Sequence, residues 1–315
     1  MERNLYLDGI FGLVVGDALG VPVESESREN LRMNPVIDMR EYGTYHLPRG
    51  TWSDDSSMTL ATVDSLANGY ILEDIMDKFV IWMVKKEYTA LGRIFDMGFI
   101  TRNAINKYLL TCDLAICGGN LESSNGNGSL MRILPVCIYL FEKKSGMIEG
   151  EKVDIIHQVS SLTHRHARSK VACGLYYFCV KSILSSKNEL CRKVQDGIRA
   201  GMNFYQQNSI YVEELPYFAR LMDIDRFALL SEEKIKSTGY VVDSLEAAIW
   251  CLLTTDNYRE CVLKAVNLGR DTDSTAAIVG GLAGLEYGYD EIPKEWMEVI
   301  ARREWIYELC CTMNV

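Results

Sequence analysis

The sequence predicts an all-α protein that folds as one domain over residues 1–315. Apolar residues recur at spacings of three and four along most of the chain, which is the period of a helix with one buried face. Few segments alternate apolar and polar residues as strands do, and only 6 prolines interrupt the pattern. Of its 315 residues 48% are hydrophobic, enough to bury one substantial core. We therefore expect a single compact multi-helix domain.

The helical period is clearest in residues 79–83 and 245–253, where apolar side chains share one face. Apolar segments at 58–66 and 276–285 each follow a run of hydroxyl and acidic residues, which is typical of a helix start. Stretches rich in glycine, proline and polar residues predict turns between the helices. These stretches are residues 42–50, 118–128 and 213–216.

Two predicted helices carry a small residue at every third or fourth position. Glycine inside a helix costs up to about 1 kcal/mol relative to alanine, so its repeated use needs a reason. Close approach of another backbone is that reason, and tightly packed central helices can hold the residues at their ends in fixed geometry. The two seams are Gly9, Gly12, Gly16 and Gly20, and Ala276, Gly280, Gly284 and Gly288.

The net charge of -10 argues against broad binding of nucleic acids, which needs clustered Lys and Arg. The first eight residues lack the apolar stretch of a secretory signal, and the apolar runs, such as residues 276–285, are too short to span a bilayer. We expect a soluble cytoplasmic protein without membrane contact. The sequence carries no signal for its oligomeric state.

Two neighbouring aspartates, Asp54 and Asp55, lie between Ser53 and Ser56 just before the apolar segment 58–66. Capping of a helix explains one such side chain, because a single cap position uses one side chain. It does not explain two adjacent carboxylates flanked by hydroxyls. Hard cations such as Mg²⁺ prefer carboxylate, hydroxyl and water oxygens, so a metal site is the second interpretation.

A second group of the same kind, Asp271, Asp273 and Ser274, precedes the apolar segment 276–285. A calcium-binding EF-hand loop is an alternative for this group alone. It fails because the sixth loop position would be Ala276 instead of glycine and the twelfth Leu282 instead of glutamate. Two groups together favour a site for one or two divalent cations. Zinc is not indicated, since the 10 cysteines contain no C-x-x-C pair.

Two further polar segments bear on a ligand site. Residues 124–129 are rich in glycine, asparagine and serine, and such backbone can present N–H groups to phosphate oxygens, although most such runs are turns. His164 and His166 lie two residues apart, and at that spacing on a helix they would diverge and could not share a zinc ion. We assign substrate hydrogen bonding to His164 and a structural role to His166.

The chain resembles the ADP-ribosylglycohydrolase family, which includes bacterial dinitrogenase reductase-activating glycohydrolases and animal ADP-ribosylhydrolases. Five separated motifs carry the resemblance, and their order and wide spacing make coincidence improbable. They are Gly-Asp-Ala-Leu-Gly at 16–20 with Glu24 beyond it, Trp-Ser-Asp-Asp-Ser at 52–56, Gly-Asn-Gly-Ser-Leu-Met-Arg at 126–132, Thr-His at 163–164, and Asn-Leu-Gly-Arg-Asp-Thr-Asp-Ser at 267–274.

The resemblance implies an all-α fold with a central cleft that holds two Mg²⁺ or Mn²⁺ ions. The implied activity is hydrolysis of the glycosidic bond at the anomeric carbon of ADP-ribose, which releases ADP-ribose from a modified protein or a small-molecule conjugate. Such a reaction develops oxocarbenium character and needs an oriented water and a proton-handling carboxylate. The implied metal ligands are Ser53, Asp54, Asp55, Asp271, Asp273 and Ser274.

The same resemblance assigns catalysis to Glu24, the proton-handling candidate, together with Asp54 and Asp55. Pro22 is expected to end or redirect the preceding helix, which places Glu24 on a bend. The substrate-binding candidates are Ser124, Gly126, Asn127, Gly128, Ser129 and His164, with the diphosphate on the N–H groups of the glycine-rich loop.

The chain departs from the family pattern at two positions. Arg270 replaces a common glycine, and Asn125 replaces an aromatic residue of some relatives. Both changes bear on adenine placement and target specificity. A non-catalytic ADP-ribose-binding or crystallin-like protein is the alternative function, and a nucleotide phosphohydrolase is a third. The linkage that is cleaved, whether to arginine, serine, an acetyl group, nucleic acid or a small molecule, stays open from the sequence.

Overall fold

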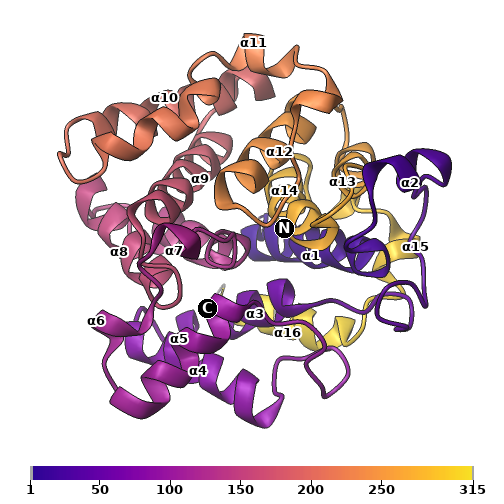
Figure 1. Ribbon diagram of the computed structural model, residues 1–315, viewed down its shortest axis with the longest axis horizontal. Helices are drawn as coiled ribbons and strands as arrows, with labels where there is room; N and C mark the ends of the chain where they lie inside the picture. Colours follow the sequence, from indigo (N-terminus) through magenta and orange to yellow (C-terminus); the bar gives the residue numbers. More distant parts are fainter. Residues whose placement is uncertain (1–2, 314–315) are drawn as a thin grey trace.

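Helices supply the regular structure of this computed structural model, which describes residues 3–313 (Figure 1). Within residues 3–313 there is no β-strand, and two isolated bridges join Gly119 to His164 and Gly126 to Tyr240. The predicted all-α class is confirmed. The α-helices are α1 (Leu5–Gly20), α2 (Arg28–Met33), α3 (Asp54–Leu66), α4 (Leu72–Lys85), α5 (Phe99–Thr111), α6 (Leu114–Cys117), α7 (Leu134–Lys143), α8 (Glu149–Ser161), α9 (Ala167–Ser185), α10 (Leu190–Gln206), α11 (Ile224–Ala228), α12 (Val241–Leu253), α13 (Tyr258–Asn267), α14 (Thr272–Tyr287), α15 (Lys294–Met297) and α16 (Arg303–Thr312).

Short 3₁₀ helices connect several of these elements: η1 (Val21–Val23), η2 (Glu122–Ser124), η3 (Leu130–Arg132), η4 (Val212–Met222), η5 (Glu232–Lys234) and η6 (Tyr289–Glu291). One of them corrects the sequence expectation. Residues 213–216, expected as a turn, belong to η4, which Phe218 and Leu221 anchor by their burial. The helical periods at 79–83 and 245–253 are confirmed within α4 and α12.

The helices α1 and α14 form a central pair whose backbones touch (Figure 1). A Cβ atom added to Gly12 would lie 2.3 Å from the carbonyl oxygen of Gly280, and one added to Gly16 would lie 2.2 Å from that of Ala276. A Cβ on Gly284 would lie 2.1 Å from the carbonyl oxygen of Asp8. Only residues without a side chain allow this approach, so the predicted glycine seams are confirmed along the middle of both helices.

The two seams are shorter than the sequence pattern suggested. A Cβ on Gly9 would meet side chains, with Ile138 Cδ1 at 3.1 Å, instead of the α14 backbone. Gly288 ends α14 with a φ of +99°, a conformation that glycine adopts without the steric cost of a Cβ atom.

The segment Leu5–Val23 is long and apolar enough to cross a membrane by length and composition alone, which corrects the expectation that no apolar run reaches that length. In the structure, 94% of its apolar window is buried inside the protein. A buried central helix of a helical domain meets the same criteria, and the packing against α14 describes α1 as such a helix.

The end of this central pair carries the polar groups of interest. Thr272, the first residue of α14, donates from its hydroxyl to the carbonyl oxygen of Gly20 at 2.9 Å, which joins the start of α14 to the end of α1. The start of α3 packs against the same end of α1 through Asp17. Three helix termini therefore converge, and both predicted acidic groups lie at this point.

Candidate metal centre and cleft

The first acidic pair lies in the opening turn of α3. Ser53 is the N-cap residue, and its hydroxyl accepts from the N–H of Asp55 at 3.3 Å and donates to Asp55 Oδ2 at 3.0 Å. Because Ser53 caps the helix, neither Asp54 nor Asp55 is needed for capping. Both carboxylates are nevertheless buried.

Asp17, in the Gly-Asp-Ala-Leu-Gly motif, is a buried acid whose role the sequence does not predict. Its carboxylate accepts from the N–H of Ser53 and from the N–H of Ser56, each at 3.0 Å, and from the Ser56 hydroxyl at 2.5 Å. These bonds tie the start of α3 to α1. Asp17 thus fixes the position of the residues between Ser53 and Ser56.

The second acidic group opens α14 and meets the first directly. The Ser274 hydroxyl donates to Asp55 Oδ2 at 3.2 Å, so Ser53 and Ser274 approach the same carboxylate oxygen from two helices. Asp273 is buried, and its Oδ1 accepts from the N–H of Ser274 at 2.9 Å. Residues separated by more than 200 positions are therefore joined in one polar cluster.

Carboxylate oxygens within this cluster lie close enough to share cations. Atoms of Asp17, Asp55 and Asp273 lie within 4.8 Å of one another, and so do atoms of Glu24, Asp271 and Asp273. Asp273 belongs to both sets. Asp55 Oδ1 and Asp273 Oδ2 are buried without a hydrogen-bond partner among the described residues. Buried oxygens left unpaired in this way fit a divalent cation, because hard cations favour oxygen ligands.

The pKa shifts of the clustered carboxyl groups also indicate a cation site. Burial raises the pKa of Asp17 and of Asp271 to about 6 each. Burial and the neighbouring carboxylates raise the pKa values of Asp54, Asp55 and Asp273 well above the ordinary range. Like charges at this separation resist joint ionisation unless a cation compensates them.

Glu24 lies where the sequence placed it, on a bend. Helix α1 ends at Gly20, η1 carries Pro22, and Glu24 follows in an extended conformation. Its carboxylate accepts a hydrogen bond from the Tyr45 hydroxyl. Burial, together with the charge of Asp96, raises the pKa of Glu24 to about 7, which suits a group that exchanges protons near neutral pH.

Asp96 is an acidic residue that the sequence reasoning missed. It lies in the segment between α4 and α5, lines the same cleft as Glu24 and Asp54, and its pKa is raised by burial. No hydroxyl or second acid adjoins it in the sequence, where it follows Phe95. Its place beside the cluster depends on how the segment folds back, so no local pattern could reveal it.

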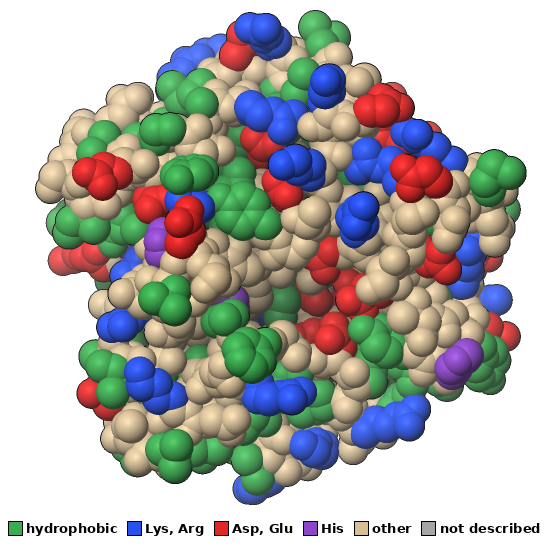
Figure 2. All heavy atoms as spheres, in the orientation of Figure 1, with side chains coloured by type: hydrophobic (Ala, Val, Ile, Leu, Met, Phe, Trp, Pro, Cys, Tyr) green, Lys and Arg blue, Asp and Glu red, His purple; other side chains and the backbone are tan. Residues whose placement is uncertain are grey.

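A cleft of about 290 Å³ opens over the cluster. Figure 2 shows acidic side chains gathered in a hollow near the middle of the visible face. The structure brings most of the predicted site residues to this cleft. Of those named from the sequence, its lining includes Glu24, Asp54, Asp271, Ser274, Gly126, Asn127, Gly128 and His164.

The residues at the ends of the glycine-rich loop point into the protein, whereas those in its middle line the cleft. The Ser129 hydroxyl lies 3.0 Å from that of Ser160, and Asn125 Oδ1 accepts from the Ser169 hydroxyl at 2.9 Å, so both side chains point into the protein. Ser124 is buried beside Gly119. The N–H of Asn127 donates to the carbonyl oxygen of Gly239 at 2.9 Å. Substrate contacts by this loop stay a prediction, centred on Gly126 and Gly128.

The two histidines separate as expected. His164 is buried at the edge of the cleft, and its Nδ1 lies 2.8 Å from the Thr163 hydroxyl. His166 is the N-cap of α9, where its Nδ1 accepts from the N–H of Arg168 at 3.2 Å. The structural role that we assigned to His166 is confirmed by that cap.

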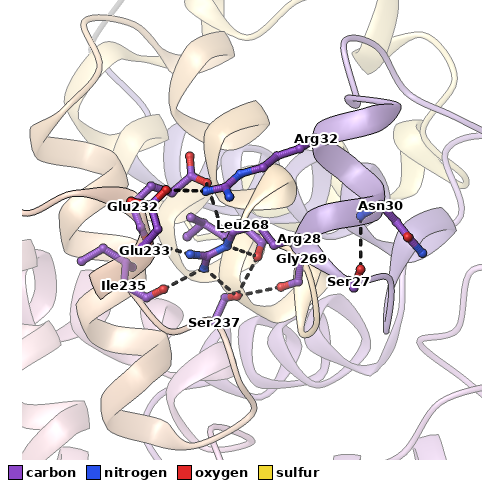
Figure 3. A network of polar contacts seen from close by, with 10 residues as sticks. All are labelled: Ser27, Arg28, Asn30, Arg32, Glu232, Glu233, Ile235, Ser237, Leu268 and Gly269. Atoms are coloured by element: carbon purple, nitrogen blue, oxygen red, sulfur yellow. Dashed lines mark hydrogen bonds and ion pairs between the residues drawn. The ribbon is translucent and has the colours of Figure 1, made fainter.

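An arginine network supports the loop that leads to Asp271 (Figure 3). Arg28 of α2 donates to the carbonyl oxygens of Leu268 at 2.8 Å, Glu232 at 2.6 Å and Ile235 at 2.7 Å. The N–H of Asp271 in turn donates to the carbonyl oxygen of Ser237 at 3.1 Å. Three separate segments are therefore held together directly behind the second acidic group.

Arg270, one of the two departures from the family pattern noted in the sequence, has a φ of +66°. This left-handed conformation is costly for a residue with a Cβ atom and free of that cost for glycine. The Arg270 side chain lies outside the cleft lining, in a neighbouring hollow beside Arg28.

Known proteins match this chain along nearly its full length. The sequence profile of the ADP-ribosylglycohydrolase family matches residues 2–313. An ADP-ribosylarginine hydrolase of Serratia proteamaculans is 33% identical over 303 residues, covering 95% of this chain and 76% of the relative. The ADP-ribosyl-[dinitrogen reductase] glycohydrolase of Rhodospirillum rubrum is 28% identical over 299 residues, covering 92% and 88%. A solved structure described as an ADP-ribosylglycohydrolase-related protein complex superposes with a TM-score of 0.78 at 27% identity, covering 98% of this chain and 96% of that one.

Proposed function

Since the chain belongs to the ADP-ribosylglycohydrolase family and is a hydrolase of ADP-ribose conjugates, we propose that it is metal-dependent and cleaves ADP-ribosyl-arginine. The metal dependence is supported by one observation. The two acidic groups lie together around Asp273, and buried oxygens of Asp55 and Asp273 have no hydrogen-bond partner among the described residues.

Two Mg²⁺ or Mn²⁺ ions are the proposed cofactors. Bound there, they would supply Lewis-acid polarisation of ribose hydroxyls and of a water molecule. Asp17 already accepts hydrogen bonds on both carboxylate oxygens, so its contribution is to hold α3 in place. The proposed ligands are Ser53, Asp54, Asp55, Asp271, Asp273 and Ser274.

Glu24 is the proposed proton-handling group. It stands at the cleft wall, and its Oε2 is oriented by the Tyr45 hydroxyl. The Thr44 hydroxyl also donates to the Glu24 carbonyl oxygen at 2.7 Å, which fixes the backbone of the bend. A carboxylate held in this way, with a pKa near 7, can take a proton from a water molecule that attacks the anomeric carbon.

The diphosphate of ADP-ribose is proposed to lie against Gly126 and Gly128. Of the described residues that line the cleft, none is a lysine or arginine. Negative phosphate oxygens therefore depend on backbone N–H groups, on the ring of His164 and on bound cations.

The arginine linkage is supported by the charge of the cleft and by the relatives. The guanidinium group is a cation with several N–H donors, which suits the carboxylate of Asp96, a cleft residue outside the proposed ligand set. The relative from Serratia is named an ADP-ribosylarginine hydrolase. An acetyl ester or a serine O-glycoside offers no positive charge to this acidic wall.

A panel of ADP-ribose conjugates tests the proposal. Arginine-linked, serine-linked and O-acetyl-ADP-ribose would be incubated with the protein and Mg²⁺ or Mn²⁺, and free ADP-ribose would be measured. We expect selective turnover of the arginine conjugate. Binding of ADP-ribose without any turnover would favour the non-catalytic alternative, and release of inorganic phosphate or AMP from a nucleotide would favour the phosphohydrolase.

The metal assignment has its own test. Metal ions that bind the folded state raise the melting temperature by mass action. Replacing Asp273 with Asn removes a carboxylate from both three-acid sets, so it should diminish the Mn²⁺-induced shift more than Asp271→Asn or Asp55→Asn, which each affect one set. Asp196→Asn on α10, where Asp196 pairs with Arg192, is the control. Unchanged Mn²⁺ affinity in all three cluster variants would exclude the assignment.

A further inference from the structure

Arg132, in the last position of the Gly-Asn-Gly-Ser-Leu-Met-Arg motif, is completely buried. Its Nη2 donates to the Thr163 hydroxyl at 2.7 Å and to the carbonyl oxygen of Val159 at 3.3 Å. Its Nε and Nη1 have no hydrogen-bond partner among residues 3–313, and its guanidinium carbon lies 4.6 Å from the centre of the Phe79 ring. A buried cation without a carboxylate partner is costly and calls for an explanation.

The Thr163 hydroxyl connects this cation to His164. Thr163 Oγ1 lies 2.7 Å from Arg132 Nη2 and 2.8 Å from His164 Nδ1. A hydroxyl group has one proton to donate and two lone pairs to accept with. Arginine only donates, so Thr163 accepts from Arg132, and its single proton is then available for a bond to His164 Nδ1.

The imidazole of His164 can then carry its proton on one atom only. Burial, with the charge of Arg132, lowers the pKa of His164 to about 3, so the ring is neutral at physiological pH. A neutral imidazole has a single N–H, and its tautomer is set by the hydrogen bond that the other nitrogen makes. With Nδ1 accepting from Thr163, the proton resides on Nε2.

Nε2 faces the glycine-rich loop. A Cβ atom added to Gly126 would lie 3.5 Å from Nε2, and one added to Gly128 would lie 2.7 Å from Cε1 and 3.3 Å from Nε2. The backbone on either side of the ring is fixed, since Gly119 donates to the Thr163 carbonyl at 2.8 Å and accepts from the N–H of Arg165 at 2.7 Å. With Nδ1 beside the Thr163 hydroxyl, Nε2 lies on the side of Gly126 and Gly128, which line the cleft.

We propose that Arg132 and Thr163 are positioning residues that lock His164 as the neutral Nε2–H tautomer, a fixed donor to a phosphate oxygen of ADP-ribose. Only the identity of the acceptor rests on the proposed function. Hydrogen bonds in series polarise one another. The series from Arg132 through Thr163 to His164 therefore makes the Nε2–H group a stronger hydrogen-bond donor. A donor that neither ionises nor rotates suits an anionic ligand in a cleft whose described lining residues include no lysine or arginine.

Nitrogen-15 NMR of histidine-labelled protein tests the tautomer without any ligand. The chain has 4 histidines, and His164→Gln identifies the signals of His164 by difference. We expect the wild type to show a protonated Nε2 and an accepting, unprotonated Nδ1. Thr163→Ser keeps the hydroxyl and should keep this pattern, whereas Thr163→Val should lose it. His157, which is buried and bonded through Nε2 to Tyr205 at 2.8 Å, is the internal control and should not change.

Calorimetric titration with ADP-ribose gives the second readout. Thr163→Val should bind about tenfold more weakly, the scale of one lost hydrogen bond to a charged acceptor, and Thr163→Ser should bind as the wild type does. A proton on Nδ1 or a doubly protonated ring in the wild type would overturn the proposal, and so would an unchanged tautomer and affinity in folded Thr163→Val. Failure of the wild type to bind ADP-ribose, with the Nε2–H tautomer present, would overturn the proposed ligand and the proposed function together.

Discussion

The side-chain amide of Asn127 donates to Oδ2 of Asp271 at 2.6 Å, and to the hydroxyl of Ser244 at 2.9 Å. This relationship joins the glycine-rich loop to the second acidic group. The bond lowers the pKa of Asp271 against the raising effect of burial. Asn127 therefore helps to keep Asp271 ionised and correctly oriented for a cation.

Replacing Asn127 with alanine should weaken Mn²⁺ binding by about tenfold or more, the usual effect of removing a group that orients a metal ligand. Calorimetric titration of the metal-free protein at neutral pH measures it. Asn125→Ala is a matched control, because Asn125 belongs to the same loop but bonds to Ser169. Equal Mn²⁺ affinities in the two variants would show that the Asn127 bond has no role at the metal site.

The acidic cluster should make the metal-free protein less stable as the pH rises. Unfolded carboxyls titrate near pH 4, whereas the folded pKa values are about 6 for Asp17 and Asp271 and about 7 for Glu24. Between about pH 4 and 7 the folded state therefore binds more protons than the unfolded state. The stabilising contribution of these groups is complete below pH 4 and is lost as the pH rises through 7.

Thermal unfolding in EDTA should accordingly give a higher melting temperature at pH 5 than at pH 7.5. With Mn²⁺ present, the melting temperature should instead be higher at pH 7.5 than at pH 5, because the metal ligands must lose protons to bind. Asp273→Asn removes a charge from the centre of the cluster and should flatten the metal-free profile. A wild-type melting temperature that increases from pH 5 to 7.5 in EDTA would contradict the predicted direction.

Features set by local sequence were predictable. The acidic groups stand out because a helix start, paired carboxylates and flanking hydroxyls are adjacent in the chain, and the spacing of the glycines indicates close helix packing directly. The bend at Glu24 follows from Pro22 in the same way.

Features set by tertiary contacts were not predictable. Asp17 gains its role only because α1 crosses the start of α3, and Asp96 only because a loop returns to the cleft. The bond from the Asn127 amide to Asp271 joins residues 144 positions apart, and the predicted substrate contact of Asn127 stays a prediction. No periodicity or spacing encodes such pairings.

The Arg28 network predicts a long-range effect on the metal site (Figure 3). Arg28→Ala leaves three carbonyl groups without their donor, among them that of Leu268 in the loop before Asp271. We expect a loss of about 2 kcal/mol in the free energy of unfolding, and weaker Mn²⁺ binding in the protein that remains folded. Chemical denaturation and calorimetric titration measure the two effects.

Arg32→Ala is the matched control for Arg28. Arg32 lies one helical turn further along α2 and pairs with Glu232 at 2.8 Å and Glu233 at 2.9 Å, with 47% of its side chain exposed. Exposed pairs of this kind contribute at most about 1 kcal/mol. Equal stability and equal Mn²⁺ affinity of Arg28→Ala and Arg32→Ala would show that the Arg28 network does not support the metal site.

Glu24→Gln should lower kcat by about 100- to 10,000-fold, the range expected for loss of a general acid or base. The substitution keeps the size of the side chain and its ability to accept from Tyr45, and it removes only the ionisable carboxylate. Binding of ADP-ribose should stay near the wild-type level. Steady-state turnover of the arginine conjugate, with titration of ADP-ribose and Mn²⁺, separates kcat from binding.

Tyr45→Phe tests how the orientation of the Glu24 carboxylate affects turnover when the carboxylate itself is kept. Without the hydroxyl, Glu24 keeps its carboxylate but loses the donor that orients Oε2. Because that donor lowers the pKa of Glu24, its loss should move the acidic limb of the kcat profile to higher pH, while Glu24→Gln should abolish that limb. If Glu24→Gln binds Mn²⁺ and ADP-ribose normally and turns over at the wild-type rate, Glu24 does not handle the proton, and another cleft carboxylate such as Asp96 must do so.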